Sequence, residues 1–220
     1  FLVRICGSAA VTNALGSVAV SIDSPFRMPV EFSVAAYRFG HSLIRNQYWL
    51  SHAQTNASLT DVFNFVRVPN LPVLSNWVVD FNAFFETGVN VPIFNHAMKI
   101  DSFLAGGLSQ IPGGAGIMGI LAARNLRRGL AFGLPSGQAT AAAFGLQSMT
   151  QAELTQGLPQ AEIDVLTAEN GLLLNKTPLW YYILREAAVQ ENGDRLGALG
   201  ARIVAETFIT MLKRDSSSFL

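Results

Sequence analysis

Charge and cysteine are both scarce in this sequence. Only 14% of the 220 residues are charged, against about 25% in an average globular domain. Basic and acidic residues number 15 each, so the net charge is zero and no surface for nucleic acid is expected. The single cysteine, Cys6, excludes an intrachain disulfide, and no Cys and His residues have the spacing of a zinc site. A single cysteine does not indicate in which cellular compartment the protein resides.

Apolar residues, in contrast, make up 50% of the chain, which excludes disorder and predicts a large core. The uncharged stretch 5–22 is diluted by Ser, Thr and Asn and is expected to form a buried helix. Two further uncharged stretches, 103–123 and 129–149, contain Pro112, Pro135 and several glycines, which disfavour a membrane-spanning helix. No transmembrane segment is therefore expected.

Most of the chain has the periodicity of helices. The longest is expected over residues 30–51, after Pro29, where apolar and aromatic residues recur at threes and fours. Ser136 and Thr150 are expected helix caps, the latter with Glu153 at capping-box spacing. Other helices are predicted at 95–104, 117–130, 159–170, 178–192 and 196–213. No segment alternates with period two and no linker divides the chain, so the expected fold is all-α in one domain, 1–220.

The helix expected over 30–51 carries an unusual polar face. At helical offsets around His41 lie Tyr37, Arg38, Arg45 and Tyr48. Arginines beside small and apolar residues need an anion, because an unpaired desolvated charge costs several kcal/mol. One interpretation is a histidine ligand to a metal whose carrier bears carboxylates, with Gly40 leaving room for a flat ligand. The other, more frequent arrangement is a core histidine with two arginines that bridge neighbouring helices.

A second polar cluster follows at 124–128, where three arginines and Asn125 stand in an expected helix. The arginines suit the negative pole of a helix C-terminus. Asn125 lies among Leu and Ala residues and needs a partner if it is buried. Its oxygen is a suitable acceptor for the second ring nitrogen of a metal-bound histidine.

Several short motifs together resemble one family. Residues 36–44 (AYRFGHSLI), 121–128 (LAARNLRR) and 133–135 (GLP) are similar to the proximal haem helix and the Asn/Arg motif of the animal haem peroxidase family, the peroxidase–cyclooxygenase superfamily. They look most like its short bacterial members, and residues 196–206 resemble that family's last core helix. Each motif alone is weak, but their order and separation agree across nearly the whole chain.

The resemblance implies a role for each matching residue. His41 would be the proximal iron ligand of haem b, and Asn125 would accept a hydrogen bond from its other ring nitrogen. Arg38 and Arg128 would pair with the haem propionates. The implied activity is peroxide reduction with oxidation of small donors, in which Asn125 and Arg38 would be catalytic residues of this chain. The implied partners are haem, hydrogen peroxide and a small electron donor.

The family's distal half has no matching segment here. Its distal histidine, with a glutamine and an arginine, comes earlier in the family's chain than the proximal helix, and so do the calcium loop and the haem-attachment carboxylates. None of these is carried over. His52 and His96 are expected to be surface or structural histidines. The chain thus resembles a proximal, C-terminal part, incomplete alone, whose partner would be a distal-half polypeptide. Family members are often exported, but nothing in the sequence is a signal.

The position of the tyrosines favours a peroxidase over the superfamily's fatty-acid dioxygenases. Those enzymes need a radical tyrosine three residues before the proximal histidine, and that position is Arg38. Tyr37 is turned by about 100° on the helix. Two alternatives stay open. One is a non-catalytic helical binding or interaction module, and the other is a haem-binding storage or sensing protein that lacks the distal acid–base group.

Overall fold

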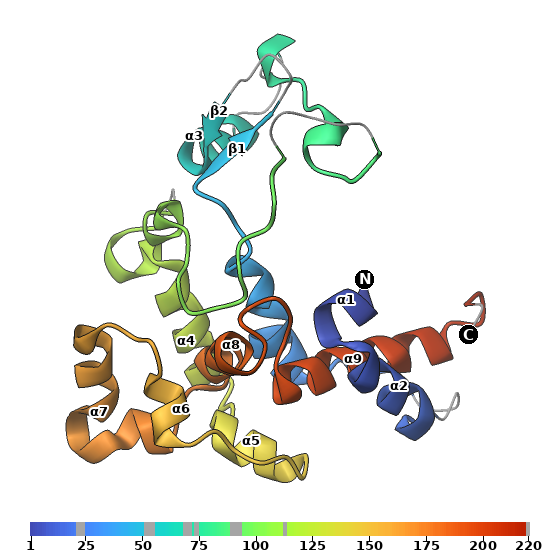
Figure 1. Ribbon diagram of the computed structural model, residues 1–220, viewed down its shortest axis with the longest axis vertical. Helices are drawn as coiled ribbons and strands as arrows, with labels where there is room; N and C mark the ends of the chain where they lie inside the picture. Colours follow the sequence, from blue (N-terminus) through green and yellow to red (C-terminus); the bar gives the residue numbers. More distant parts are fainter. Residues whose placement is uncertain are drawn as a thin grey trace. The chain divides into compact units, whose positions relative to one another are not determined.

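A computed structural model describes residues 1–20, 25–50, 56–67, 72, 75–88, 94–111 and 114–218 (Figure 1). The chain is 60% helical, and a small two-stranded sheet is the described β structure, which confirms the all-α class. Contacts divide the chain into two compact units. The first comprises Phe1–Ser42, Lys99–Phe103 and Arg124–Leu220, and the second comprises Leu43–Met98 and Leu104–Ala123.

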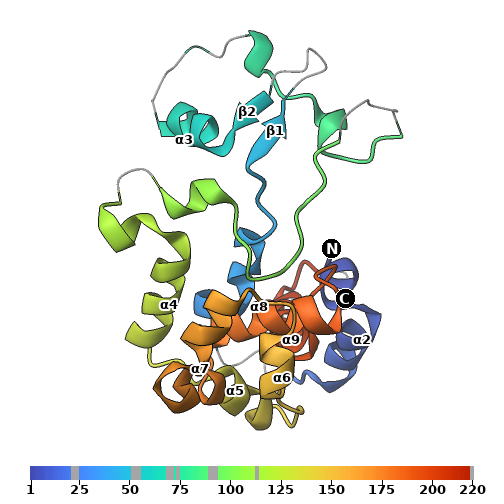
Figure 2. The same ribbon diagram turned by 60° about the vertical axis from the view of Figure 1, so that its left-hand side comes forward.

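Helices dominate the first unit. They are α1 (Leu2–Cys6), α2 (Ser8–Ser17), the π-helical turn η1 (Glu31–Ala35), the 3-10 helix η2 (Ala36–His41), α4 (Leu121–Ala131, in this unit from Arg124), α5 (Gly137–Ala143), α6 (Gln151–Thr155), α7 (Gln160–Asn175), α8 (Leu179–Gln190) and α9 (Ala198–Arg214). Helix α8 is apolar around most of its circumference and lies at the centre of the unit's packing. It packs against α5, α6, α9 and the η1–η2 segment, and Figure 2 shows it alongside α6 and α9.

The helix starts predicted for the last third of the chain are confirmed. The Ser136 hydroxyl accepts a hydrogen bond from the backbone N–H of Ala139 and caps α5. Thr150 and Glu153 form the reciprocal bonds of a capping box at the start of α6. The backbone of α7 is non-helical at residues 168–171, so its first helical segment stops close to the expected end near residue 170, and a second short segment continues to Asn175.

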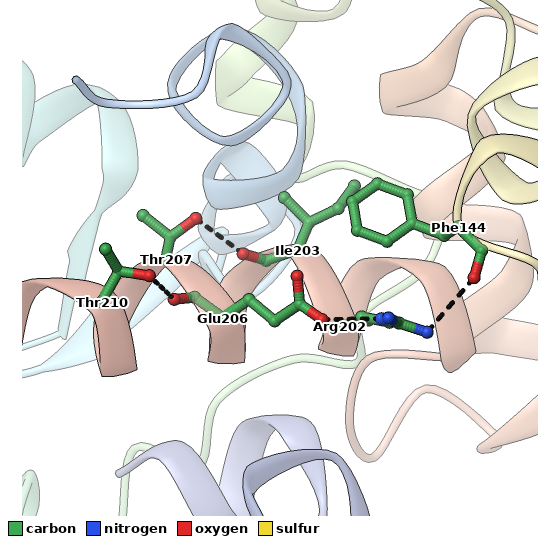
Figure 3. A network of polar contacts seen from close by, with 6 residues as sticks. All are labelled: Phe144, Arg202, Ile203, Glu206, Thr207 and Thr210. Atoms are coloured by element: carbon green, nitrogen blue, oxygen red, sulfur yellow. Dashed lines mark hydrogen bonds and ion pairs between the residues drawn. The ribbon is translucent and has the colours of Figure 1, made fainter. Parts of the chain in front are cut away.

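One ion pair on α9 ties this helix to the end of α5. The Arg202 Nε donates to Glu206 at 2.7 Å, and its Nη1 donates to the backbone oxygen of Phe144 at 3.2 Å (Figure 3). The same guanidinium lies 5.3 Å from the centre of the Phe144 ring. Arg202 therefore forms an ion pair within α9 and holds this helix against the end of α5 through a hydrogen bond and a cation–π contact with Phe144.

The second unit contains the sheet and short helices. Strand β1 (Gln47–Trp49) pairs antiparallel with β2 (Asn56–Ser58), with Tyr48 opposite Ala57. Helix α3 (Leu59–Arg67) follows, and the 3-10 turns are η3 (Ser75–Trp77), η4 (Phe81–Ala83), η5 (Gly106–Ser109) and η6 (Gly116–Gly119). Leu59, Ala105 and Leu108 form the buried centre of this unit.

The helix predicted over 30–51 is wrong beyond His41. The Ser42 hydroxyl donates to the Phe39 carbonyl at 2.8 Å as η2 ends, and the chain then enters β1. The spacing of aromatic residues such as Tyr48 and Trp49 is compatible with a strand as well as with a helix. Pairing with β2 determines that this segment forms a strand.

The helix predicted over 95–104 is also wrong, since no helix forms there. The buried Asn95 side chain donates to the carbonyls of Trp49 and Ala83, at 2.8 and 3.1 Å, and its oxygen accepts from Trp49 N–H. Further along, Ile100 N–H donates to Gly193 O at 2.8 Å. The Ile100 bond satisfies a backbone N–H that a helix would have paired locally.

The N-terminal stretch is helical but divided. Two helices, α1 and α2, replace the single helix expected over 5–22, with Gly7 at a positive φ of 78° between them, and most α2 residues are exposed. Residues 21–24 lie outside the described part of the chain. No described helix is long and apolar enough to span a membrane.

Candidate functional site

His41 and Asn125, predicted as a pair, lie in contact. The Nδ2 atom of Asn125 is 3.0 Å from Nδ1 of His41. His41 is the last residue of η2 and is half-buried, while Asn125 sits in the middle of α4 with 2% of its surface exposed. A buried amide needs a partner, and the histidine ring supplies it. The contact joins two segments far apart in the sequence.

The direction of this hydrogen bond differs from the expected one. In the structure the amide nitrogen faces the ring, so Asn125 donates to an unprotonated Nδ1, whereas its oxygen was expected to accept from Nδ1–H. The two ends of an amide have nearly the same shape, and a half-turn of the side chain exchanges donor and acceptor. The two arrangements fix opposite tautomers of the neutral ring. An amide nitrogen toward Nδ1 leaves the proton on Nε2, whereas an amide oxygen toward Nδ1 leaves the Nε2 lone pair free. The His41 Nε2 has no hydrogen-bond partner among the described residues.

Arg38 and Arg128 bring positive charge to the same place. Burial and the Arg128 charge lower the pKa of Arg38, and burial and the Arg38 charge lower the pKa of His41. The Arg38 Nε is buried without a hydrogen-bond partner. Within the described part of the chain, neither arginine forms an ion pair with an acidic side chain. The cluster therefore has an excess of cations that an anion would neutralise.

Local backbone geometry explains how Arg38 reaches His41. The π-helical turn η1 passes into η2 at Ala35, which has φ −124° and ψ −70°, and the Ala36 N–H reaches the carbonyls of Glu31 and Phe32. In a 3-10 helix, residues three apart lie above one another, so Arg38 and His41 share a face. A Cβ atom added at Gly40 would meet nothing within 4 Å. A side chain at position 40, next to His41 in the chain, would thus have open space.

The other members of the predicted polar face do not join this cluster. Tyr37 stacks on Phe32, with ring centres 4.7 Å apart, and packs edge-on against Phe208. Arg45 and Tyr48 lie beyond the helix end in the second unit, where Arg45 N–H donates to the Tyr48 hydroxyl at 3.0 Å. Of the five residues predicted to share a face, the structure brings together Arg38 and His41.

The remaining histidines do not extend the cluster. His96 is exposed, with its ring 4.8 Å from that of Phe94, in line with the surface position expected for it. His52 lies outside the described residues. Among the described residues, no three His, Cys, Asp or Glu side chains gather to hold a metal ion. The chemistry of the cluster thus rests on one imidazole with a free nitrogen.

Two buried charged residues of α8 were not anticipated from the sequence. Arg185 is 3% exposed and its Nε donates to the Leu154 carbonyl at 3.0 Å. Glu186 is 1% exposed and accepts from the backbone N–H groups of Leu199 and Gly200. The signal available in the sequence was their position within the apolar run of α8. A charged residue in such a run is either buried with a hydrogen-bond partner or faces solvent on a polar side of the helix.

Comparison with known protein families finds none that matches this chain, and comparison with curated proteins finds no match.

Proposed function

We propose that this chain forms the proximal side of a haem peroxidase, with His41 as the axial ligand to the haem iron. The observation that carries the proposal is the 3.0 Å contact between His41 Nδ1 and the buried Asn125 amide. With the amide turned so that its oxygen accepts from Nδ1–H, the lone pair of Nε2 is free for iron. A metal-bound histidine usually makes such a second hydrogen bond, which orients the ring and sets its basicity. The lowered pKa of His41 keeps the imidazole neutral, which is the form that binds a metal.

The arginines and the glycine support the same proposal. Haem carries two propionate groups, and Arg38 and Arg128 are cations without acidic partners among the described residues. The buried Nε of Arg38 would gain an acceptor. Gly40 leaves open space next to His41, as a flat macrocycle requires. An imidazole and two guanidinium groups are the kinds of side chain that bind the iron and the propionates of haem b.

When bound, haem supplies the redox chemistry of peroxide reduction with oxidation of small donors. The residues of this chain bind and orient it. His41 holds the iron, Asn125 fixes the ring that does so, and Arg38 and Arg128 position the propionates. The distal acid–base group would come from a distal-half polypeptide, which we propose as the protein partner.

The first test is haem binding by the purified chain. Addition of haemin should produce a Soret band that saturates at one haem per chain, and His41→Ala should lose its axial-ligand features. His96→Ala is the matched control and should bind as the wild type, since His96 is exposed outside the cluster. Absence of a Soret band after haem addition would contradict the proposal.

A second variant separates haem binding from folding. Gly40→Leu should leave the circular dichroism spectrum and unfolding midpoint nearly unchanged, because an added Cβ meets no neighbour within 4 Å. The same side chain should weaken haem binding because it enters the space beside His41. Peroxide-dependent oxidation of a phenolic donor, measured with and without any co-purifying polypeptide identified by mass spectrometry, then tests the activity. Haem binding without turnover in both preparations would favour the haem-storage or sensing alternative.

A further inference from the structure

A cavity of about 410 Å³ opens in the first unit beside Asn125. Residues of α4, the start of α5 and the start of α8 line it, and its walls are mostly apolar: Leu126, Leu130, Leu134, Pro135 and Leu179. His41, Arg38 and Arg128 are not among its lining residues. Its volume lies within the range of small-molecule sites, about 300–1,000 Å³. None of the three residues that we propose to contact haem therefore lines it.

Two polar groups of this cavity have no partner in the described part of the chain. Trp180 is 5% exposed, and its indole Nε1 is buried without an acceptor. Buried indole N–H groups normally have a hydrogen-bond partner. Lys176 lines the cavity on its exposed side, and no acidic side chain among the described residues pairs with it. One neutral donor and one cation thus border an apolar space.

The starts of α5 and α8, which both contribute lining residues, are fixed to each other. The Gly137 N–H donates to Thr177 O at 2.8 Å, and Ser136 and Pro178 form an isolated bridge. Gly137 packs so closely on the Tyr182 ring that an added Cβ would overlap it. The Tyr182 hydroxyl in turn accepts from Met149 N–H at 2.8 Å. The space is thus preformed, which lowers the ordering cost of binding.

We propose that this cavity binds a small apolar carboxylate, such as an aryl-substituted or short fatty acid. The apolar body would cover the leucines, and the carboxylate would lie toward Lys176 and accept a hydrogen bond from the Trp180 indole. A neutral apolar molecule would lack the contact with Lys176, and a polyanion would not match the apolar walls. Binding at this site does not require haem, so the carboxylate proposal can be tested independently of the proposed function.

The test uses naphthylacetate and its neutral amide, naphthylacetamide, added to the isotope-labelled chain without haem. We expect saturable shifts of the Trp180 indole resonance, with tighter binding of the acid than of the amide. Lys176→Gln should weaken acid binding about three- to fivefold, as for an exposed charge pair, and leave amide binding unchanged. Lys99→Gln, an exposed lysine that does not line the cavity, should bind both as the wild type does.

Ala139 offers a matched pair of variants. Ala139→Leu should abolish the shifts because Ala139 lines the cavity, whereas Ala142→Leu, an exposed alanine of the same helix outside the lining, should not. Unaltered binding by Ala139→Leu, or equal affinity for acid and amide, would overturn the proposal. Displacement of the probe by haem would also overturn it, because the cavity would then belong to the haem site. A dimer in analytical ultracentrifugation that Ala139→Leu dissociates would assign the cavity to a second copy of the chain, and this too would overturn it.

Discussion

The Asn125 amide lies 3.0 Å from His41 Nδ1, although 84 residues separate the two in the chain. The contact joins η2 to α4, and the Asn125 side chain that forms it is almost fully buried. Loss of one partner leaves the other buried and unsatisfied, which costs more than the hydrogen bond itself contributes. This pair therefore stabilises the fold as well as orienting the imidazole.

Replacement of Asn125 by leucine should lower the free energy of unfolding by about 1–3 kcal/mol, because a similar volume is kept while the His41 nitrogen loses its partner. Urea unfolding measures the change. A double-mutant cycle with His41→Leu should show a coupling energy of about 0.5–1.5 kcal/mol. Gln147→Leu, at an exposed position, is the control and should change stability by less than about 0.5 kcal/mol. Equal stability of Asn125→Leu and wild type would contradict a structural role for the pair.

Removal of the Arg38 charge should raise the pKa of His41. Burial and Arg38 both lower this pKa, so the folded protein binds the proton less tightly than the unfolded chain does. Stability contributed by neutral His41 is therefore present above the unfolded-state pKa of about 6.5 and falls as the pH drops below it. Arg38→Gln should make this fall shallower. NMR titration of the His41 ring protons, without haem, gives the pKa directly.

Arg27→Gln is the control for this titration, since Arg27 is exposed and is not a cause of the lowered His41 pKa. An unchanged His41 pKa in Arg38→Gln would show that the two side chains do not interact.

The sequence predicted those helices whose ends carry local signals. The hydroxyls of Ser136 and Thr150 cap α5 and α6 as expected, because capping depends on residues within one turn. The helices predicted at 30–51 and 95–104 fail where partners distant in sequence decide the structure. Strand β1 depends on β2, and Asn95 satisfies the backbone of Trp49 and Ala83. The spacing of hydrophobic residues does not show which distant segment will pair with a given stretch of chain.

The candidate site was also predictable where local signals sufficed and not where the local backbone geometry departs from an α-helix. The need of a buried Asn125 for a partner was predictable, and its partner is the expected His41. The offsets of an α-helix placed Arg38, Arg45 and Tyr48 with His41, but η2 ends at His41, so only Arg38 of these three lies on the same helix as His41. The switch from a π-helical turn to a 3-10 helix was not visible in the sequence, since residues 31–41 have no glycine or proline before Gly40.

Glu186 should make stability depend on pH near neutrality. Burial raises the pKa of Glu186 to about 7, from 4.5, although two backbone N–H groups of α9 partly offset this. Because the folded-state pKa is the higher one, its contribution is complete below about pH 4.5 and is lost as the pH rises through about 7, by up to about 3 kcal/mol. Glu186→Gln keeps an acceptor for α9 and removes the titration.

The difference in unfolding free energy between wild type and Glu186→Gln, measured from pH 4 to 8, isolates this contribution from other titrating groups. It should change across the interval in favour of the variant at high pH. Glu191→Gln, which removes a less buried carboxylate paired with Arg195, is the control for the loss of a charge from the same part of the chain. A constant difference for Glu186→Gln would show that the buried carboxyl does not titrate in this range.

Gly137 and Gly16 should respond in opposite ways to alanine. At Gly137 an added Cβ would overlap the ring of the buried Tyr182, so Gly137→Ala should destabilise the protein by about 1–3 kcal/mol or more. At Gly16, inside α2, an added Cβ meets nothing within 4 Å, so Gly16→Ala should stabilise it by up to about 1 kcal/mol through helix propensity. Urea unfolding of both variants measures the two changes. If Gly137→Ala were as stable as Gly16→Ala, the close packing of α5 on α8 would be wrong.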